Sequence, residues 1–327
     1  MWFLLYNKKR GDNMSFTTSV KNEICLLSFS NTENIAELSA FVRSNAKVSD
    51  TILELSTENA KVAKRVYLLF KSLYGVDISL EQRKLANFSR KKIYIITILS
   101  KINDILSDLS VIDKNGNFIE NPKEYLIDSQ EDKKAYLRGT FLSKGSINDP
   151  KTSQYHLEFG FDNKFEAVFV QRLLNEFDMN SKIIIRDVKY MVYIKEAEKI
   201  SDFLKIISAF KAVLYYENIR IYKEQKNNTN RLNNCEQANM DKIIETCNSQ
   251  LKDIELIEEK MGLDLLDDKI REACLYRKKY PESSLTELSN IISLENNVNI
   301  TKSGLNHRFR KIKEIANRLK ENGKRDD

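Results

Sequence analysis

The chain has 327 residues, of which 42% are hydrophobic and 31% charged, and this is enough to build the cores of two domains. The formal net charge is only +6, and three prolines and nine glycines argue against long low-complexity segments. Four scattered cysteines and no apolar run of about 18 residues argue against a disulfide scaffold, a zinc cluster and a membrane span. We therefore expect a cytoplasmic protein with free thiols and with neither a metal nor another cofactor.

The N-terminal residues 1–13 contain a short apolar run followed by a basic cluster. This order and length do not fit a secretory signal, in which the basic part comes first. We expect Met14 to be the natural start, with residues 1–13 as an extension and a first helix over residues 15–27.

An internal repeat follows, in which residues 38–50 match residues 137–149 at a constant offset of 99. Both copies predict a helix, a strand near Val48 or Ile147, and then the same order of elements. The predicted elements are strands at 51–57 and 155–161, helices at 58–74 and 164–178, strand pairs at 76–81 with 93–98 and 182–186 with 190–194, and helices at 101–109 and 196–209. The halves span about 14–110 and 130–212.

Small residues, Ala40 and Gly139, stand at equivalent positions of the two repeated helices. They let two helices approach closely about a pseudo-two-fold axis. This layout resembles the LAGLIDADG fold of homing endonucleases, an αββαββα-type fold in which each helix ends in a metal-binding acid. Asn45 and Lys144 occupy those ends here, and Asp50 and Asp149 are not expected to replace the acids. We predict a retained scaffold without catalysis, so the protein is not expected to be an enzyme.

Residues 211–261 connect the repeat to the rest of the chain. Tyrosines at 215, 216 and 222 alternate with basic residues at 220, 223 and 226, a pattern found in nucleic-acid contacts and equally in helices whose tyrosines pack inward. We expect a polar hinge at 227–230, a long helix over 235–260, and a boundary between domains 14–225 and 226–327.

The sequence pattern predicts that the C-terminal domain is all-helical. A helix is predicted over 268–279, and Ser284 with Glu287 forms a capping box for a short helix over 285–292. A turn over 293–300 leads to Thr301, the expected N-cap of a longer basic helix. Two short helices, a turn and a basic helix make a helix-turn-helix unit, although this turn is longer than usual.

The final helix is expected to bind double-stranded DNA. Its apolar residues recur at helical spacing, and residues 299–327 hold nine Lys/Arg against four Asp/Glu, nearly the entire net charge of the chain. The usual alternative is an ordinary solvated helix face. For base contacts we expect Arg310 to bind guanine and Asn306 adenine, with Ser303 and His307 alongside. The residues expected to hold phosphates are Lys302, Arg308, Lys311 and Lys313.

A duplicated LAGLIDADG-like domain followed by a helix-turn-helix resembles the WhiA family of Gram-positive bacteria. The similarity runs through residues 134–147, 155–158, 230–239 and 302–312. The family often has Gly where Lys144 stands, and its turn before the last helix is usually shorter. The resemblance implies a DNA-binding regulator of sporulation or cell division, with roles in chromosome segregation.

The fold expected is therefore α+β, with a duplicated LAGLIDADG-like domain before an all-α helix-turn-helix domain. The function expected is a sequence-specific, nucleoid-associated transcription regulator, and the alternatives are an active endonuclease or maturase, or a nucleoid protein without sequence preference. The repeat domain is expected to bind either DNA or a protein such as the transcription machinery. No nucleotide-binding or zinc-protease motif occurs. We expect His156 to be a polar residue of a strand without a catalytic role.

Overall fold

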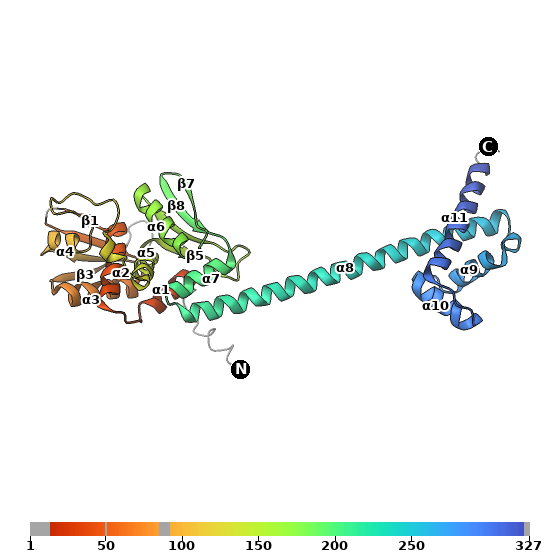
Figure 1. The fold of residues 1–327 in the computed structure, drawn as a ribbon, viewed down its shortest axis with the longest axis horizontal. Helices are drawn as coiled ribbons and strands as arrows, with labels where there is room; N and C mark the ends of the chain where they lie inside the picture. The colour runs from red at the N-terminus through yellow and green to blue at the C-terminus, as the bar shows by residue number, and fades with distance from the viewer. Residues whose placement is uncertain (1–13, 50, 85–91, 324–327) are drawn as a thin grey trace. The chain divides into compact units, whose positions relative to one another are not determined.

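The computed structural model describes residues 14–49, 51–84 and 92–323. The expected N-terminal extension, 1–13, and Asp50 lie outside the described residues. Contacts divide the chain into two compact units, one ending at Lys223 and the other beginning at Glu224. Figure 1 colours the elements of both units by residue number.

The first half of the repeat forms a four-stranded antiparallel sheet in the order β1-β2-β4-β3. Ser30 and Glu33 form a capping box that starts the repeat helix α2. The elements are α1 (Phe16–Ile24), α2 (Asn31–Asn45), β1 (Lys47–Val48), β2 (Leu53–Thr57), α3 (Ala60–Tyr74), β3 (Ile78–Lys84), β4 (Lys92–Ile98) and α4 (Ile102–Asp108).

The second half repeats this order, and its sheet runs β5-β6-β8-β7. The loop before it holds the short helix η1 (Glu124–Leu126). The elements are α5 (Gln130–Lys144), β5 (Gly145–Ile147), β6 (Leu157–Phe161), α6 (Lys164–Glu176), β7 (Lys182–Arg186), β8 (Lys189–Ile194) and α7 (Ala197–Ile206). The predicted duplicated αββαββα fold is confirmed.

Helices α2 and α5 pack side by side at the centre of this unit (Figure 1). A Cβ atom added at Gly139 would lie 2.1 Å from the backbone oxygen of Glu37 and 3.0 Å from the Cβ of Ala40. Only glycine permits this approach, because the obstructing atom belongs to the backbone. The hydroxyls of Ser44 and Ser143, which are equivalent in the repeat, lie 3.1 Å apart, as the pseudo-two-fold relation requires.

A buried ion cluster joins the two halves. Glu37 on α2 accepts hydrogen bonds from Arg65 of α3, with Nη2 at 2.9 Å, and from Nε of Arg138 on α5 at 2.5 Å. The ring centroid of Phe29 lies 3.4 Å from the guanidinium carbon of Arg138, whose side chain is 1% exposed. Glu37 thus pairs with two buried cations that would otherwise be very costly, and Glu33, whose carboxylate lies 3.6 Å from Nη2 of Arg138, supplies a second negative charge.

The predicted hinge at 227–230 is wrong. Helix α8 (Phe210–Lys260) passes through these residues without a break. Asparagine and threonine lower helix propensity by only a few tenths of a kcal/mol each, roughly 0.5, and the span contains neither Gly nor Pro to break it. The helix starts against α1, where the Glu23 carboxylate accepts from the backbone N–H groups of Lys211 and Ala212 at 2.6 and 3.0 Å.

The second unit packs the end of α8 against η2 (Leu263–Leu265), α9 (Asp268–Lys279), α10 (Leu285–Asn296) and α11 (Lys302–Gly323). The predicted capping box of Ser284 and Glu287 starts α10. The core contains one apolar stripe from each helix: Ile254, Ile257, Leu266, Ala273, Cys274, Leu288, Ile292, Ile300, Leu305, Phe309, Ile312 and Ala316.

The turn of the helix-turn-helix is shorter than predicted. Helix α10 continues one turn further, to Asn296, and Asn297 ends it in the left-handed region with φ 52°. Asparagine tolerates that conformation better than most residues. Ser293 does not begin the turn but lies inside the helix, where its hydroxyl accepts from the N–H of Ile300 at 2.9 Å. The connection is therefore 297–301, and the expected 293–300 is corrected.

Candidate nucleic-acid interface

Helix α11 begins where the sequence predicted. The hydroxyl of Thr301 accepts from the N–H of Gly304 at 3.1 Å, which satisfies one free donor of the first turn. Leu305, Phe309 and Ile312 are buried in the core of the second unit. The predicted apolar stripe therefore fixes which side of the helix faces outward.

The outward side carries most of the residues expected to contact DNA. Asn306 is half-buried, whereas the other members of this set are exposed. Within the part of the chain that the structure describes, their side chains have neither a hydrogen bond nor an ion pair. These free polar residues are Lys302, Ser303, Asn306, His307, Arg310, Lys311 and Lys313.

Arg308 differs from this group. Its Nη1 lies 2.6 Å from a carboxylate oxygen of Glu272 and 3.2 Å from the backbone oxygen of Lys269, both on α9. The side chain is 17% exposed. Because its charge is already paired inside the unit, Arg308 fastens α11 to α9, and its expected phosphate contact stays a prediction.

A further arginine, Arg277 on α9, supports the helix from within and was missed from the sequence. It is completely buried, donates to Gln250 on α8 at 2.9 Å and to the backbone oxygen of Ser283, and lies 5.4 Å from the ring centroid of Phe309 on α11. The available signal was its spacing, because it follows the buried Ala273 and Cys274 by four and three residues.

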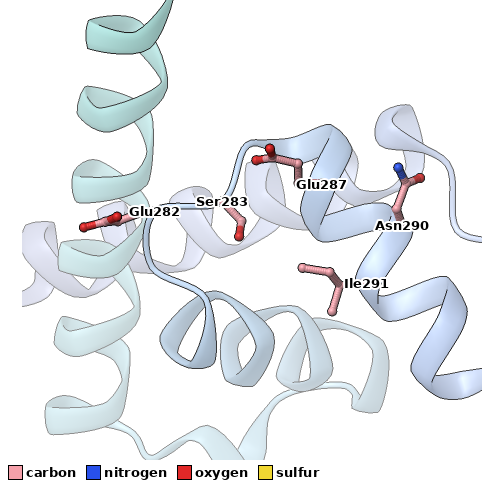
Figure 2. A pocket seen from close by; sticks show the side chains of 5 residues that line it. All are labelled: Glu282, Ser283, Glu287, Asn290 and Ile291. Atoms are coloured by element: carbon pink, nitrogen blue, oxygen red, sulfur yellow. The ribbon is translucent and has the colours of Figure 1, made fainter.

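The flank formed by α10 has the opposite charge character. This helix contains no Lys or Arg. An open hollow of about 490 Å³ lies at its start, and Figure 2 shows two carboxylates, Glu282 and Glu287, among its lining side chains with Asn290 and Ile291. Phosphates would be repelled there, so α10 itself offers no basic contact to DNA.

The residues that end the two repeat helices of the first unit make contacts within the unit. Asn45 ends α2, and its side-chain oxygen accepts from the N–H of Ser56 at 2.8 Å. Lys144 ends α5, and its ammonium lies 3.5 Å from Asp162. The described residues contain no group of three or more His, Cys, Asp or Glu placed to hold a metal. The two residues bind neighbouring parts of their own halves.

Glu166 on α6 is a buried carboxyl near this position that the sequence did not reveal. Burial raises the pKa of Glu166 to about 7, although Arg43 and Lys144 partly oppose the shift. A hydrogen bond to Ser44 also favours its ionised form. The carboxyl replaces no metal ligand, but it makes this region sensitive to pH.

The tyrosines of early α8 mainly pack inward. Tyr216 is buried beside Phe16, and the ring centroids of Tyr155 and Tyr216 lie 5.7 Å apart. Arg220 pairs with Glu217 and Glu198. The packing alternative thus explains the first part of the basic-aromatic pattern, and only Tyr222 is largely exposed. His156 pairs with Glu158 at 3.0 Å and stacks on Tyr193.

The outward faces of the two sheets are not strongly basic. In the first sheet, Glu54, Thr97 and Ser79 lie opposite one another, as do Ser56, Ile95 and Glu81. In the second sheet, the corresponding rows are Glu158, Tyr193 and Lys182, then Gly160, Met191 and Ile184. The same faces also carry Lys47 and Arg83 on the first sheet and the pair Arg186 and Lys189 on the second, so charge alone does not decide whether they meet DNA.

Three WhiA domain families match consecutive parts of the chain. The WhiA N-terminal LAGLIDADG-like domain matches residues 31–112, the WhiA LAGLIDADG-like domain residues 133–226, and the WhiA C-terminal HTH domain residues 229–316. No described helix is both long and apolar enough to cross a bilayer.

Whole proteins match over nearly their full length. "Probable cell division protein WhiA" of Bacillus cytotoxicus is 41% identical over 311 residues, which are 94% of this chain and 98% of the relative, and a Bacillus cereus relative of the same name matches equally. The crystal structure of full-length DUF199/WhiA from Thermatoga maritima has 25% identity and a TM-score of 0.56, covering 93% of this chain and 98% of that chain. The chain belongs to the WhiA family, with two LAGLIDADG-like halves before a helix-turn-helix domain.

Proposed function

We propose that this protein is a sequence-specific DNA-binding regulator that acts in cell division and associates with the nucleoid. The observation that carries the proposal is the row of free polar side chains on α11, which its apolar stripe turns away from the core. The helix-turn-helix match and the names of the Bacillus relatives support the same conclusion. Regulation of transcription and a role in chromosome segregation belong to this proposal.

In this proposal α11 enters the major groove. Arg310 donates two hydrogen bonds to guanine and Asn306 pairs with adenine, with Ser303 and His307 on the same side of the helix. Lys302, Lys311 and Lys313 bind phosphates on either side and set the register of the helix along the groove. The phosphate contact expected of Arg308 stays a prediction, because Glu272 already pairs with its guanidinium.

Binding-site selection with the full chain tests this proposal. A pool of random duplexes is enriched over several rounds, and the affinities for the selected and an unrelated duplex are compared at physiological salt. A sequence-specific regulator binds its site roughly a thousandfold more tightly or better. High affinity that is equal for both duplexes would instead identify a nucleoid protein without sequence preference.

The first unit has no catalytic role in this proposal. Lys144 places an ammonium where a nuclease needs a metal-binding acid, and Asn45 has its side-chain oxygen occupied by a backbone N–H group. Incubating the full chain with the selected duplex and Mg²⁺ should leave the DNA intact. Specific cleavage that is lost on adding a chelator would restore the endonuclease alternative.

A further inference from the structure

The two sheets of the first unit end in edge strands of different character. Each sheet has a short edge strand, β1 or β5, and a longer one, which is β3 in the first sheet and β7 in the second. Strand β3 carries Glu81, Arg83 and Lys84, and charges of this kind protect natural edges from unwanted pairing. Strand β7 instead has three consecutive isoleucines, of which Ile184 is 46% and Ile185 71% exposed. The charges of β7 lie only at its two ends, so the exposed apolar centre of this edge needs an explanation.

The backbone of β7 is open to pairing. A two-residue turn joins Arg186 to Lys189, and the residues flanking such a turn exchange both ladder hydrogen bonds. Because bonded and non-bonded pairs alternate along an antiparallel ladder, Ile183 and Ile185 direct their N–H and C=O groups away from β8. No strand among the described residues pairs with that side of β7.

Apolar side chains continue around this edge. Val188 in the turn is 88% exposed. Helix α6 is fastened to the residue before β7, because the side-chain amides of Gln171 and Asn175 donate to the backbone oxygen of Ser181. Val168, about one helical turn before Gln171, is also exposed. The edge thus combines free backbone groups with an apolar margin.

We propose that β7 is a docking edge for an extended segment of another protein, which adds a strand to the second sheet and carries acidic residues at its two ends. The charges of the edge define this partner. Lys182 and Arg186 stand at opposite ends of β7, and both are exposed. Acidic residues across from them would form favourable cross-strand pairs, while alternate apolar residues between them meet the isoleucines.

The same charges argue against a second copy of this chain. Antiparallel pairing of β7 with itself would put Lys182 opposite Arg186 at both ends. Parallel in-register pairing would put like residues opposite each other. Like charges directly opposite destabilise paired strands, so self-pairing is penalised in either direction. The inference is independent of the DNA-binding proposal, because β7 and α11 belong to different units.

The first experiment uses the full chain and two labelled, end-capped peptides, Glu-Val-Thr-Val-Glu and Lys-Val-Thr-Val-Lys. Fluorescence anisotropy measures affinity, and amide hydrogen exchange locates binding. We expect about tenfold tighter binding of the acidic peptide, with slower exchange at Ile183 and Ile185. Equal binding, protection on β3, or protection of β7 that grows with protein concentration without peptide would overturn the proposal.

A charge exchange sharpens the test. The double variant Lys182→Glu/Arg186→Glu should reverse the preference between the two peptides. The matched control, Arg83→Glu/Lys84→Glu, alters two exposed basic residues of the other edge strand and should leave the preference unchanged. A swapped variant that retains the wild-type preference would contradict the assignment to β7. The wild-type comparison remains decisive if the swapped variant is unstable.

Discussion

Arg138 of α5 and Arg310 of α11 show how the two units use the same side chain differently. Arg138 is 1% exposed and shares Glu37 with Arg65. Arg310 is exposed, and the described residues provide it with neither a hydrogen-bond acceptor nor a counter-charge. The first unit pairs its central charges internally, whereas the second leaves a row of them open to solvent. The comparison predicts stability effects in the first unit and binding effects in the second.

The largest expected effect is on stability, from Glu37→Ala. Removing this carboxylate leaves Arg65 without its buried counter-charge and Arg138 with only the more distant Glu33, and breaking such a buried pair costs about 3–5 kcal/mol. Denaturant unfolding of the full chain measures the change in unfolding free energy, which is taken from the unfolding transition of the first unit. The control Glu131→Ala removes an exposed partner of Lys134 and should cost less than about 1 kcal/mol. Equal effects would show that the buried cluster does not hold the halves together.

A smaller loss of stability is expected from Gly139→Ala. The added Cβ meets the backbone of Glu37, so α2 and α5 must separate, at a cost of about 1–3 kcal/mol. Thermal unfolding measures this cost. In the control Gly160→Ala, the nearest atom to the added Cβ is the flexible Met191 Sδ at 3.2 Å, and little change is expected. A Gly139→Ala variant as stable as this control would refute close packing at the pseudo-two-fold axis.

The repeat was predictable because its pattern occurs twice. The offset between Ala40 and Gly139 revealed the central helix pair, and Leu305 with Phe309 revealed the buried side of α11. The ion cluster was not predictable, because Glu37, Arg65 and Arg138 come from three elements that meet only in the folded chain. An isolated charge in a helix does not reveal its partner.

The errors near the helix-turn-helix have local causes. The polar run at 227–230 contains residues of modest helix propensity, and their number suggested a hinge where the structure keeps a helix. Ser293 and the polar residues after it suggested a long turn, but the serine hydroxyl bonds within and beyond α10. The ion pair of Arg308 was not predictable because its partner Glu272 lies on another helix, 36 residues earlier.

A pH-dependent effect is expected from Glu166→Gln. Burial raises the pKa of Glu166 from 4.5 to about 7. Between these pH values the folded wild type therefore keeps a proton that the unfolded chain has lost. For a carboxyl with a raised pKa, stability therefore falls as pH rises through this window, by about 2–3 kcal/mol. Because glutamine does not titrate, the unfolding free energy of the variant minus that of the wild type should rise from pH 4.5 to pH 8. A difference that does not vary with pH would contradict the raised pKa.

The variants of α11 are expected to change DNA binding. Arg310→Ala should weaken binding to the selected duplex by about 1–3 kcal/mol and leave an unrelated duplex nearly unaffected. Lys313→Ala serves as the comparison, because a phosphate contact should weaken all duplexes alike and reduce the salt slope by about one. Fluorescence anisotropy over a salt series measures both variants. If Arg310→Ala lowers both affinities equally, Arg310 does not read a base.

The most direct test of the outward side of α11 is chemical footprinting of lysines on the full chain, with and without the selected duplex. Bound DNA should shield Lys302, Lys311 and Lys313 from acetylation. Lys123, which is exposed in the first unit, should react equally in both states. If the three α11 lysines remain fully reactive at saturating duplex, α11 is not the DNA-binding surface of this protein.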